Sequence, residues 1–92
     1  MRSYKYPANF TPAEEGGFVI TFPDVPEVVT QGETIEQCIE EASDALEEAI
    51  IGRINAGEEL PTPSKAEAGQ HLISIPEQSA LKAAQYKESR SC

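Results

Sequence analysis

The 92-residue sequence predicts a small α+β domain, a βββαβ(α) sheet with one long amphipathic helix packed on it. Three observations predict this class. Short apolar–polar alternation occupies the first third of the chain, helical spacing of apolar residues follows in one long stretch, and alternation returns near residue 71. A small sheet needs a cover for its apolar face, and the helix supplies it.

The first two strands are predicted over residues 3–11 and 17–22. Both alternate, and the second, "FVITF", is rich in β-branched and aromatic residues. The "PAEEGG" segment between them is typical of a turn, so the two strands should form a hairpin. Pro7 cannot donate to a ladder, so we expect it at a position whose ladder partner is missing. A third strand is predicted over 28–31, after the "PDVP" turn.

A long helix is predicted from Thr34 to about residue 55. "TIEQ" fits a capping box, in which the Thr34 side chain accepts from the Gln37 amide and the Gln37 side chain reaches back to the Thr34 amide. The predicted apolar stripe comprises Ile35, Cys38, Ile39, Ala42, Ala45, Leu46, Ala49 and Ile50. Cys38 is expected as a free buried thiol, because two cysteines do not form a disulfide framework.

The last predicted elements are a strand over 71–75 and a helix that starts after Pro76, with Leu81 and Ala84 on its apolar side. Because this strand follows a crossover through the long helix, we expect that it can lie parallel to a neighbouring strand.

The charge distribution is one-sided. The net charge is −9, and between Lys5 and Arg53 there are eleven acids and no Lys, Arg or His. Direct phosphate binding is disfavoured, because it needs clustered cations. Acids four residues apart on the helix, such as Glu36 and Glu40, repel each other and destabilise the helix by roughly 0.2–0.5 kcal/mol per pair. Two interpretations remain open: a solvated face that keeps the protein soluble, or a surface for a basic partner.

Enzymatic chemistry has weak support. A metal-dependent nuclease needs carboxylates that converge at strand ends, whereas here Asp24 lies in the turn after the second predicted strand and the helix acids point outward. His71, the only histidine, has no companion at metal-ligand spacing and is expected to be exposed. We therefore expect no catalytic residue, metal site or cofactor. The sequence has no stretch long and apolar enough for a membrane span and no signal-peptide pattern, so a cytoplasmic protein is expected.

The stretch "GGFVITFPDVPEVVTQGETIEQCIEEASDALEEAI" resembles the HicB antitoxin family. The shared pattern is a Gly-Gly-aromatic strand, a Phe-Pro-Asp turn, a Thr-Gln-Gly run and an acidic, alanine-containing helix, and the resemblance covers roughly residues 3–85. It implies a partly RNase H-like fold without RNase H catalysis. It also implies that the first strand lies between the second and the fourth.

The resemblance implies a role as an antitoxin that neutralises HicA, a small basic RNA-cleaving toxin, by covering its RNA-binding and catalytic surface. It also implies homo-oligomers, dimers or tetramers. Under this hypothesis the candidate toxin-binding residues are Asp24, Glu36, Glu40, Asp44, Glu47 and Glu48. The alternatives are a stand-alone HicB-like regulator without a cognate toxin and, less favoured, the nuclease.

Two departures from the family pattern matter. Glu27 and Val28 stand where members often have Gly-Cys-like residues. Many members also carry a C-terminal DNA-binding module, whereas "SALKAAQY" resembles only the helix that leads into one. We therefore expect a HicB-like toxin-binding domain over 1–76 and the start of a C-terminal helix over 77–92, with the module absent or truncated. No specific DNA binding is expected from this chain alone, because the last segment holds three cations.

Overall fold

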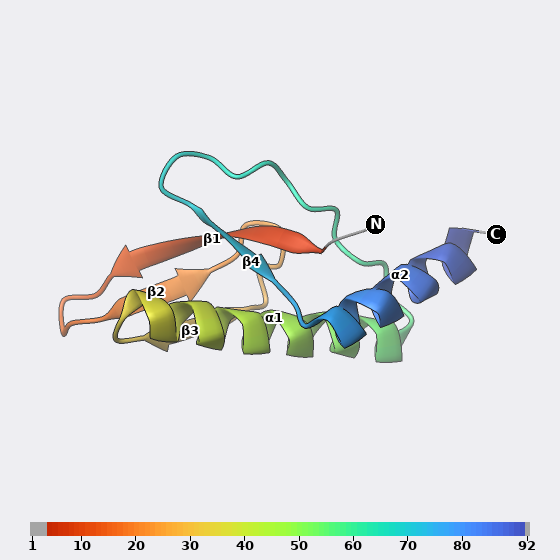
Figure 1. Ribbon diagram of the computed structural model, residues 1–92, viewed down its shortest axis with the longest axis horizontal. Helices are drawn as coiled ribbons and strands as arrows, with labels where there is room; N and C mark the ends of the chain where they lie inside the picture. The colour runs from red at the N-terminus through yellow and green to blue at the C-terminus, as the bar shows by residue number, and fades with distance from the viewer. Residues whose placement is uncertain (1–3, 92) are drawn as a thin grey trace.

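The computed structural model describes residues 4–91 and confirms the α+β class (Figure 1). The predicted order of elements is also confirmed. These are β1 (Lys5–Pro12), β2 (Phe18–Thr21), β3 (Val29–Gly32), α1 (Ile35–Ala56), β4 (His71–Ser74) and α2 (Glu77–Ser91). Residue 3, the first of the predicted strand, lies outside the described residues.

The four strands form one sheet in the order β3-β2-β1-β4, which places β1 inside as expected. The parallel orientation expected of β4 is wrong, because β4 runs antiparallel to β1, with Ile73 opposite Tyr6. The reason is the loop 57–70, which returns the chain along the sheet to the end where α1 began (Figure 1). Fourteen residues separate Ala56 from His71, enough to span up to about 46 Å when extended.

Pro7 lies where the sheet tolerates a residue without an N–H group. β1 pairs with β4 over Lys5–Ala8 and with β2 only over Asn9–Pro12. Pro7 therefore faces Leu72 on one side and has no ladder partner in β2 on the other. This arrangement agrees with the expectation for a proline inside an inner strand.

Helix α1 starts at the predicted cap. The backbone N–H of Gln37 donates to Thr34 Oγ1 at 3.1 Å, and Gln37 Oε1 accepts from the N–H of Glu33 at 2.7 Å. The second bond reaches one residue further back than the Thr34 amide that we expected. The helix ends at Gly57, whose φ of 74° is the left-handed conformation that glycine adopts easily.

The core lies between α1 and the sheet. Cys38, Ala42, Leu46 and Ile50 of α1 are fully buried against residues of β1, β2 and β4. The expected burial is wrong for two members of the predicted stripe: Ile35 and Ile39 are 38% and 44% exposed, although Cys38, in the same turns of α1, is fully buried.

Helix α2 packs against the core through small residues. Ala83 is fully buried, and Ala80 and Ala84 pack beside the core. Leu81, expected on the apolar side, is 61% exposed. Small side chains allow two helices to approach closely, and this explains why the burial pattern follows alanine rather than the largest apolar residue of the helix.

Two glycines allow β3 to pass under the start of α1. A Cβ atom at Gly32 would lie 2.9 Å from the backbone nitrogen and the Sγ of Cys38. At Gly17, where φ is +73°, it would lie 2.7 Å from the carbonyl oxygen of Gly32. The β1–β2 turn, the end of β3 and the first turn of α1 therefore meet at backbone-to-backbone distance, which requires residues without side chains.

Candidate functional site

Four of the predicted site residues form a row along the solvent face of α1, which we call the acidic row: Glu36, Glu40, Asp44 and Glu48. All four are exposed, and among residues 4–91 none of them has a hydrogen-bond or ion-pair partner. Successive members are four residues apart, a spacing at which like charges cost about 0.2–0.5 kcal/mol per pair. The row is therefore a concentration of uncompensated negative charge.

Glu47, the fifth acid predicted on this helix, has a different environment. Its carboxylate accepts a short hydrogen bond from the Ser79 hydroxyl of α2. Glu47 is half-buried, whereas its neighbour Glu48 is exposed. The hydrogen bond between Glu47 and Ser79 therefore links α1 to α2.

Asp24 is also engaged within the chain. Its two carboxylate oxygens accept from the backbone N–H and the hydroxyl of Ser64, both at 2.7 Å. Ser64 belongs to the loop 57–70, which crosses the sheet on the side away from α1 (Figure 1). Asp24 therefore lies apart from the acidic row and anchors the middle of this loop.

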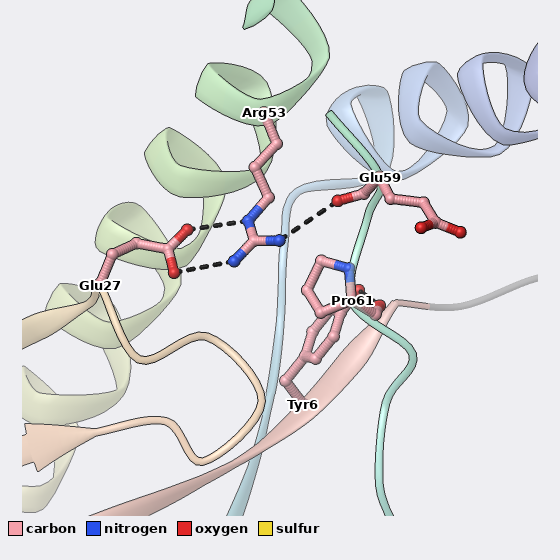
Figure 2. Close-up of polar contacts among 5 residues, drawn as sticks. All are labelled: Tyr6, Glu27, Arg53, Glu59 and Pro61. Atoms are coloured by element: carbon pink, nitrogen blue, oxygen red, sulfur yellow. Dashed lines mark hydrogen bonds and ion pairs between the residues drawn. The ribbon is translucent and has the colours of Figure 1, made fainter. Parts of the chain in front are cut away.

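An ion pair that the sequence analysis missed joins the β2–β3 turn to the end of α1. Figure 2 shows the Arg53 guanidinium with two donors on the Glu27 carboxylate, at 2.8 and 2.9 Å, and a third on the Glu59 carbonyl oxygen at 3.2 Å. The two hydrogen bonds that Arg53 donates to the Glu27 carboxylate lower the pKa of Glu27. Two signals were available: Glu27 departs from the family pattern, and Arg53 is the first cation after the acid-only stretch.

Tyr6 fixes the start of the loop beside this ion pair. Its hydroxyl donates to the Pro61 carbonyl oxygen at 2.7 Å (Figure 2). Burial raises the pKa of Tyr6 to about 12, with Tyr4 and Asp24 adding to the shift. The phenol consequently stays protonated, and able to donate, at any physiological pH.

We expect Glu27→Gln to lower the free energy of unfolding by less than about 1 kcal/mol at neutral pH, because the pair is partly exposed to solvent. The pKa of Glu27 is lowered on folding, so its contribution is present above the ordinary value of 4.5 and is lost as the pH falls through the folded value. Urea unfolding at several pH values should show the difference from the wild type at pH 7 and its disappearance in acid. Glu59→Gln is the control, because only the backbone carbonyl of Glu59 binds Arg53. A difference that grows in acid would contradict this assignment.

Two grooves lie where α1 faces β3. One, of about 660 Å³, is bounded by the β1–β2 turn, the end of β3 and the start of α1, and its lining includes Glu15, Glu33 and Glu41. The other, of about 300 Å³, lies at the start of β3 and includes Glu27 and Glu48. Of these five acids, only Glu48 was among the predicted site residues, because the grooves form between segments that are distant in sequence.

The residues considered for enzymatic chemistry lie apart. His71 is half-buried and stacks on Phe10, with ring centroids 4.2 Å apart, so the expectation that it is exposed is wrong. Over residues 4–91 no three His, Cys, Asp or Glu side chains are placed to hold a metal ion. Neither of the described helices combines the length and the apolar character that a membrane span requires.

Comparison with known proteins covers most of the chain. A family profile described as "HicB_like antitoxin of bacterial toxin-antitoxin system" matches residues 5–84. Antitoxin HicB of Escherichia coli (strain K12) is 42% identical over 72 residues, which are 78% of this chain and 52% of that protein. Antitoxin HicB 1 of Photorhabdus laumondii is 38% identical over 76 residues, 83% of this chain and 48% of that protein. The chain thus spans about half the length of the curated relatives that it matches.

A solved structure shares the fold. A chain of a toxin–antitoxin complex from Streptococcus pneumoniae superposes with a TM-score of 0.73 over 92% of this chain and 73% of that chain. Sequence identity between the two is 19%, so this similarity concerns the fold alone.

Proposed function

Because the chain belongs to the HicB-like antitoxin family of bacterial toxin–antitoxin systems, we propose that it binds a small, basic, RNA-cleaving toxin of the HicA type. In this proposal it neutralises the toxin by covering the surface that holds RNA. The complex would form in the cytoplasm, where such a toxin meets its RNA. Residues 1–76 would carry the toxin contact, and α2 would extend from them.

The observation that carries this proposal is the acidic row. A protein that cleaves RNA must attract phosphates and therefore presents cations. The row presents four exposed carboxylates without partners in the described chain, in a stretch of sequence that holds no cation. Opposite potentials accelerate encounter and fix the register of a complex. The repulsion within the row, unfavourable in the free protein, would then be relieved in the complex.

The proposal predicts that a small basic protein is encoded beside this chain's gene, and the test uses that protein. Producing that protein alone should arrest bacterial growth, and producing both proteins should restore it. In vitro, the purified chain should bind the basic protein and stop its cleavage of RNA. A Leu46→Asp variant, which places a charge at a fully buried position, is the control and should not rescue growth.

The same experiment separates a binding protein from a nuclease. RNA incubated with the chain alone, with magnesium or manganese, should stay intact. Cleavage that disappears in Asp24→Asn would overturn the proposal in favour of an enzyme. Binding without any loss of toxin activity would favour the stand-alone regulator instead.

A further inference from the structure

Strand β3 forms one edge of the sheet and has a free side. It pairs with β2 through Val29–Gly32, and no other described strand pairs with it. Among residues 4–91 no loop or side chain hydrogen-bonds to the backbone of these four residues. In an antiparallel pair, alternate residues direct their N–H and C=O groups away from the partner strand. β3 therefore offers outward-facing backbone donors and acceptors to an incoming strand.

This edge lacks the features that usually block strand addition. Proteins protect edge strands with lysine, proline, bulges or a covering segment. The four residues of β3 are Val-Thr-Gln-Gly, without charge or proline. Val29 is 67% exposed, the most exposed large apolar residue in the described chain. The edge is thus neutral along the strand and apolar at its start.

Carboxylates surround both ends of this neutral edge. The groove at the start of β3 contains Glu27 and Glu48, and the groove at its end contains Glu15, Glu33 and Glu41. Val29 lines the first groove, and Gly32 lines the second. Both grooves lie on the side of β3 that faces α1, so cationic side chains of an added strand could enter them while its backbone pairs with β3.

The carboxylates around the β3 edge indicate which kind of partner can pair with it. A second copy of this chain would bring its own carboxylates to the same place, and this would oppose pairing between two β3 edges. The other edge strand, β4, differs: Leu72 is 54% exposed, but the Ser74 carbonyl oxygen already accepts from the Ser43 hydroxyl, and neither acid-lined groove includes a residue of β4. Of these two edges, β3 is the one that combines an open strand with flanking negative charge.

We propose that a basic protein partner adds an extended strand to the free edge of β3 and places cationic side chains in the two acid-lined grooves. This inference rests on the proposed function, because it concerns the same partner. It adds a binding mode: backbone hydrogen bonds give affinity, and the charged grooves give register. It also extends the contact from the solvent face of α1 to the seam between α1 and β3.

The test compares Val29→Lys with Leu72→Lys in binding to the same basic protein that the proposed function predicts. Both substitutions add one positive charge at an exposed apolar position of an edge strand, so a general loss of charge complementarity would affect them equally. We expect Val29→Lys to raise the Kd at least tenfold, through repulsion of the incoming cations, and Leu72→Lys to change it less than twofold. Thermal melts of both variants verify folding.

Amide hydrogen exchange of the wild-type chain gives an independent readout. Alternate amides within Val29–Gly32, those directed away from β2, should exchange rapidly in the free chain and slowly in the complex. If the wild type binds but both lysine variants bind equally well and these amides stay unprotected, this inference is overturned and the proposed function stands. If the wild type does not bind, the proposed function fails first. A free wild-type dimer that Val29→Lys converts to monomer, with partner affinity unchanged, would assign the edge to a second copy and also overturn the inference.

Discussion

Reversing Glu40, Asp44 and Glu48 to lysine is expected to slow association with a basic partner by roughly 10- to 100-fold at low salt. The three carboxylates are exposed and have no partner among residues 4–91, so their field extends into solvent. Exposed charges of this kind act mainly on the encounter rate. Stopped-flow association at increasing salt should show a steep decline for the wild type and a flat response for the triple variant.

The matched control places the same charge change elsewhere. Glu58, Glu59 and Glu67 are exposed residues of the loop 57–70, and replacing these three with lysine alters the net charge by the same amount. The control variant should retain most of the association rate. Equal slowing by both variants would mean that only the total charge matters. Unchanged kinetics in the acidic-row variant would remove the row from the interaction.

Gly32→Ala is expected to lower the free energy of unfolding by about 2–3 kcal/mol, a large change for one methyl group. The new Cβ would lie 2.9 Å from the Cys38 nitrogen and 3.0 Å from its Cα, and neither atom can move unless the first turn of α1 moves. For a domain of this size the loss corresponds to a decrease in Tm on the order of 10–20 °C. Calorimetry or thermal circular dichroism measures it.

Gly52→Ala provides the opposite control. Gly52 lies inside α1, and a Cβ there would meet nothing within 4 Å. Alanine is favoured over glycine in a helix interior by about 1 kcal/mol, so this variant should be slightly more stable than the wild type. If Gly32→Ala were as stable as Gly52→Ala, the close approach of β3 to α1 would not constrain the fold.

The elements could be predicted because their signals are local. Alternation along β1 and β2 and the apolar spacing along α1 depend on residues a few positions apart. The capping residue Thr34 and the terminating Gly57 are equally local signals. The family resemblance added the position of β1 inside the sheet, which no local pattern contains. The partly RNase H-like relationship that it implies stays a prediction.

The direction of β4 could not be predicted from the same signals. A helix followed immediately by a strand returns the chain in parallel, but the loop 57–70 is long enough to reverse that outcome. Its path depends on contacts with distant residues: Pro61 with Tyr6, Ser64 with Asp24 and Gln70 with Asn9. Such pairs are formed by the fold, and the sequence alone does not reveal which residues they join.

The candidate site, like the fold, could be predicted only where its signals are local in sequence. Helical spacing placed Glu36, Glu40, Asp44 and Glu48 on one face, and the structure places them there. Helical spacing could not reveal that the Glu47 carboxylate would accept a hydrogen bond from the Ser79 hydroxyl of α2. The role of all these acids in binding remains a prediction. The grooves beside β3 arise from the packing of three separate segments, so only the structure could locate them.

The pairing of β1 with β4 also sets an order in which the sheet can form while the chain is being synthesised. Lys5 lies opposite Ser74, 69 positions later in the chain. During synthesis β1 can meet β2 almost at once, since Pro12 and Phe18 are separated by only a short turn. The other half of β1, Lys5–Ala8, has no partner until His71–Ser74 has been translated. During that interval the sheet lacks the strand that pairs with this half of β1, so its formation depends on a contact between residues far apart in sequence.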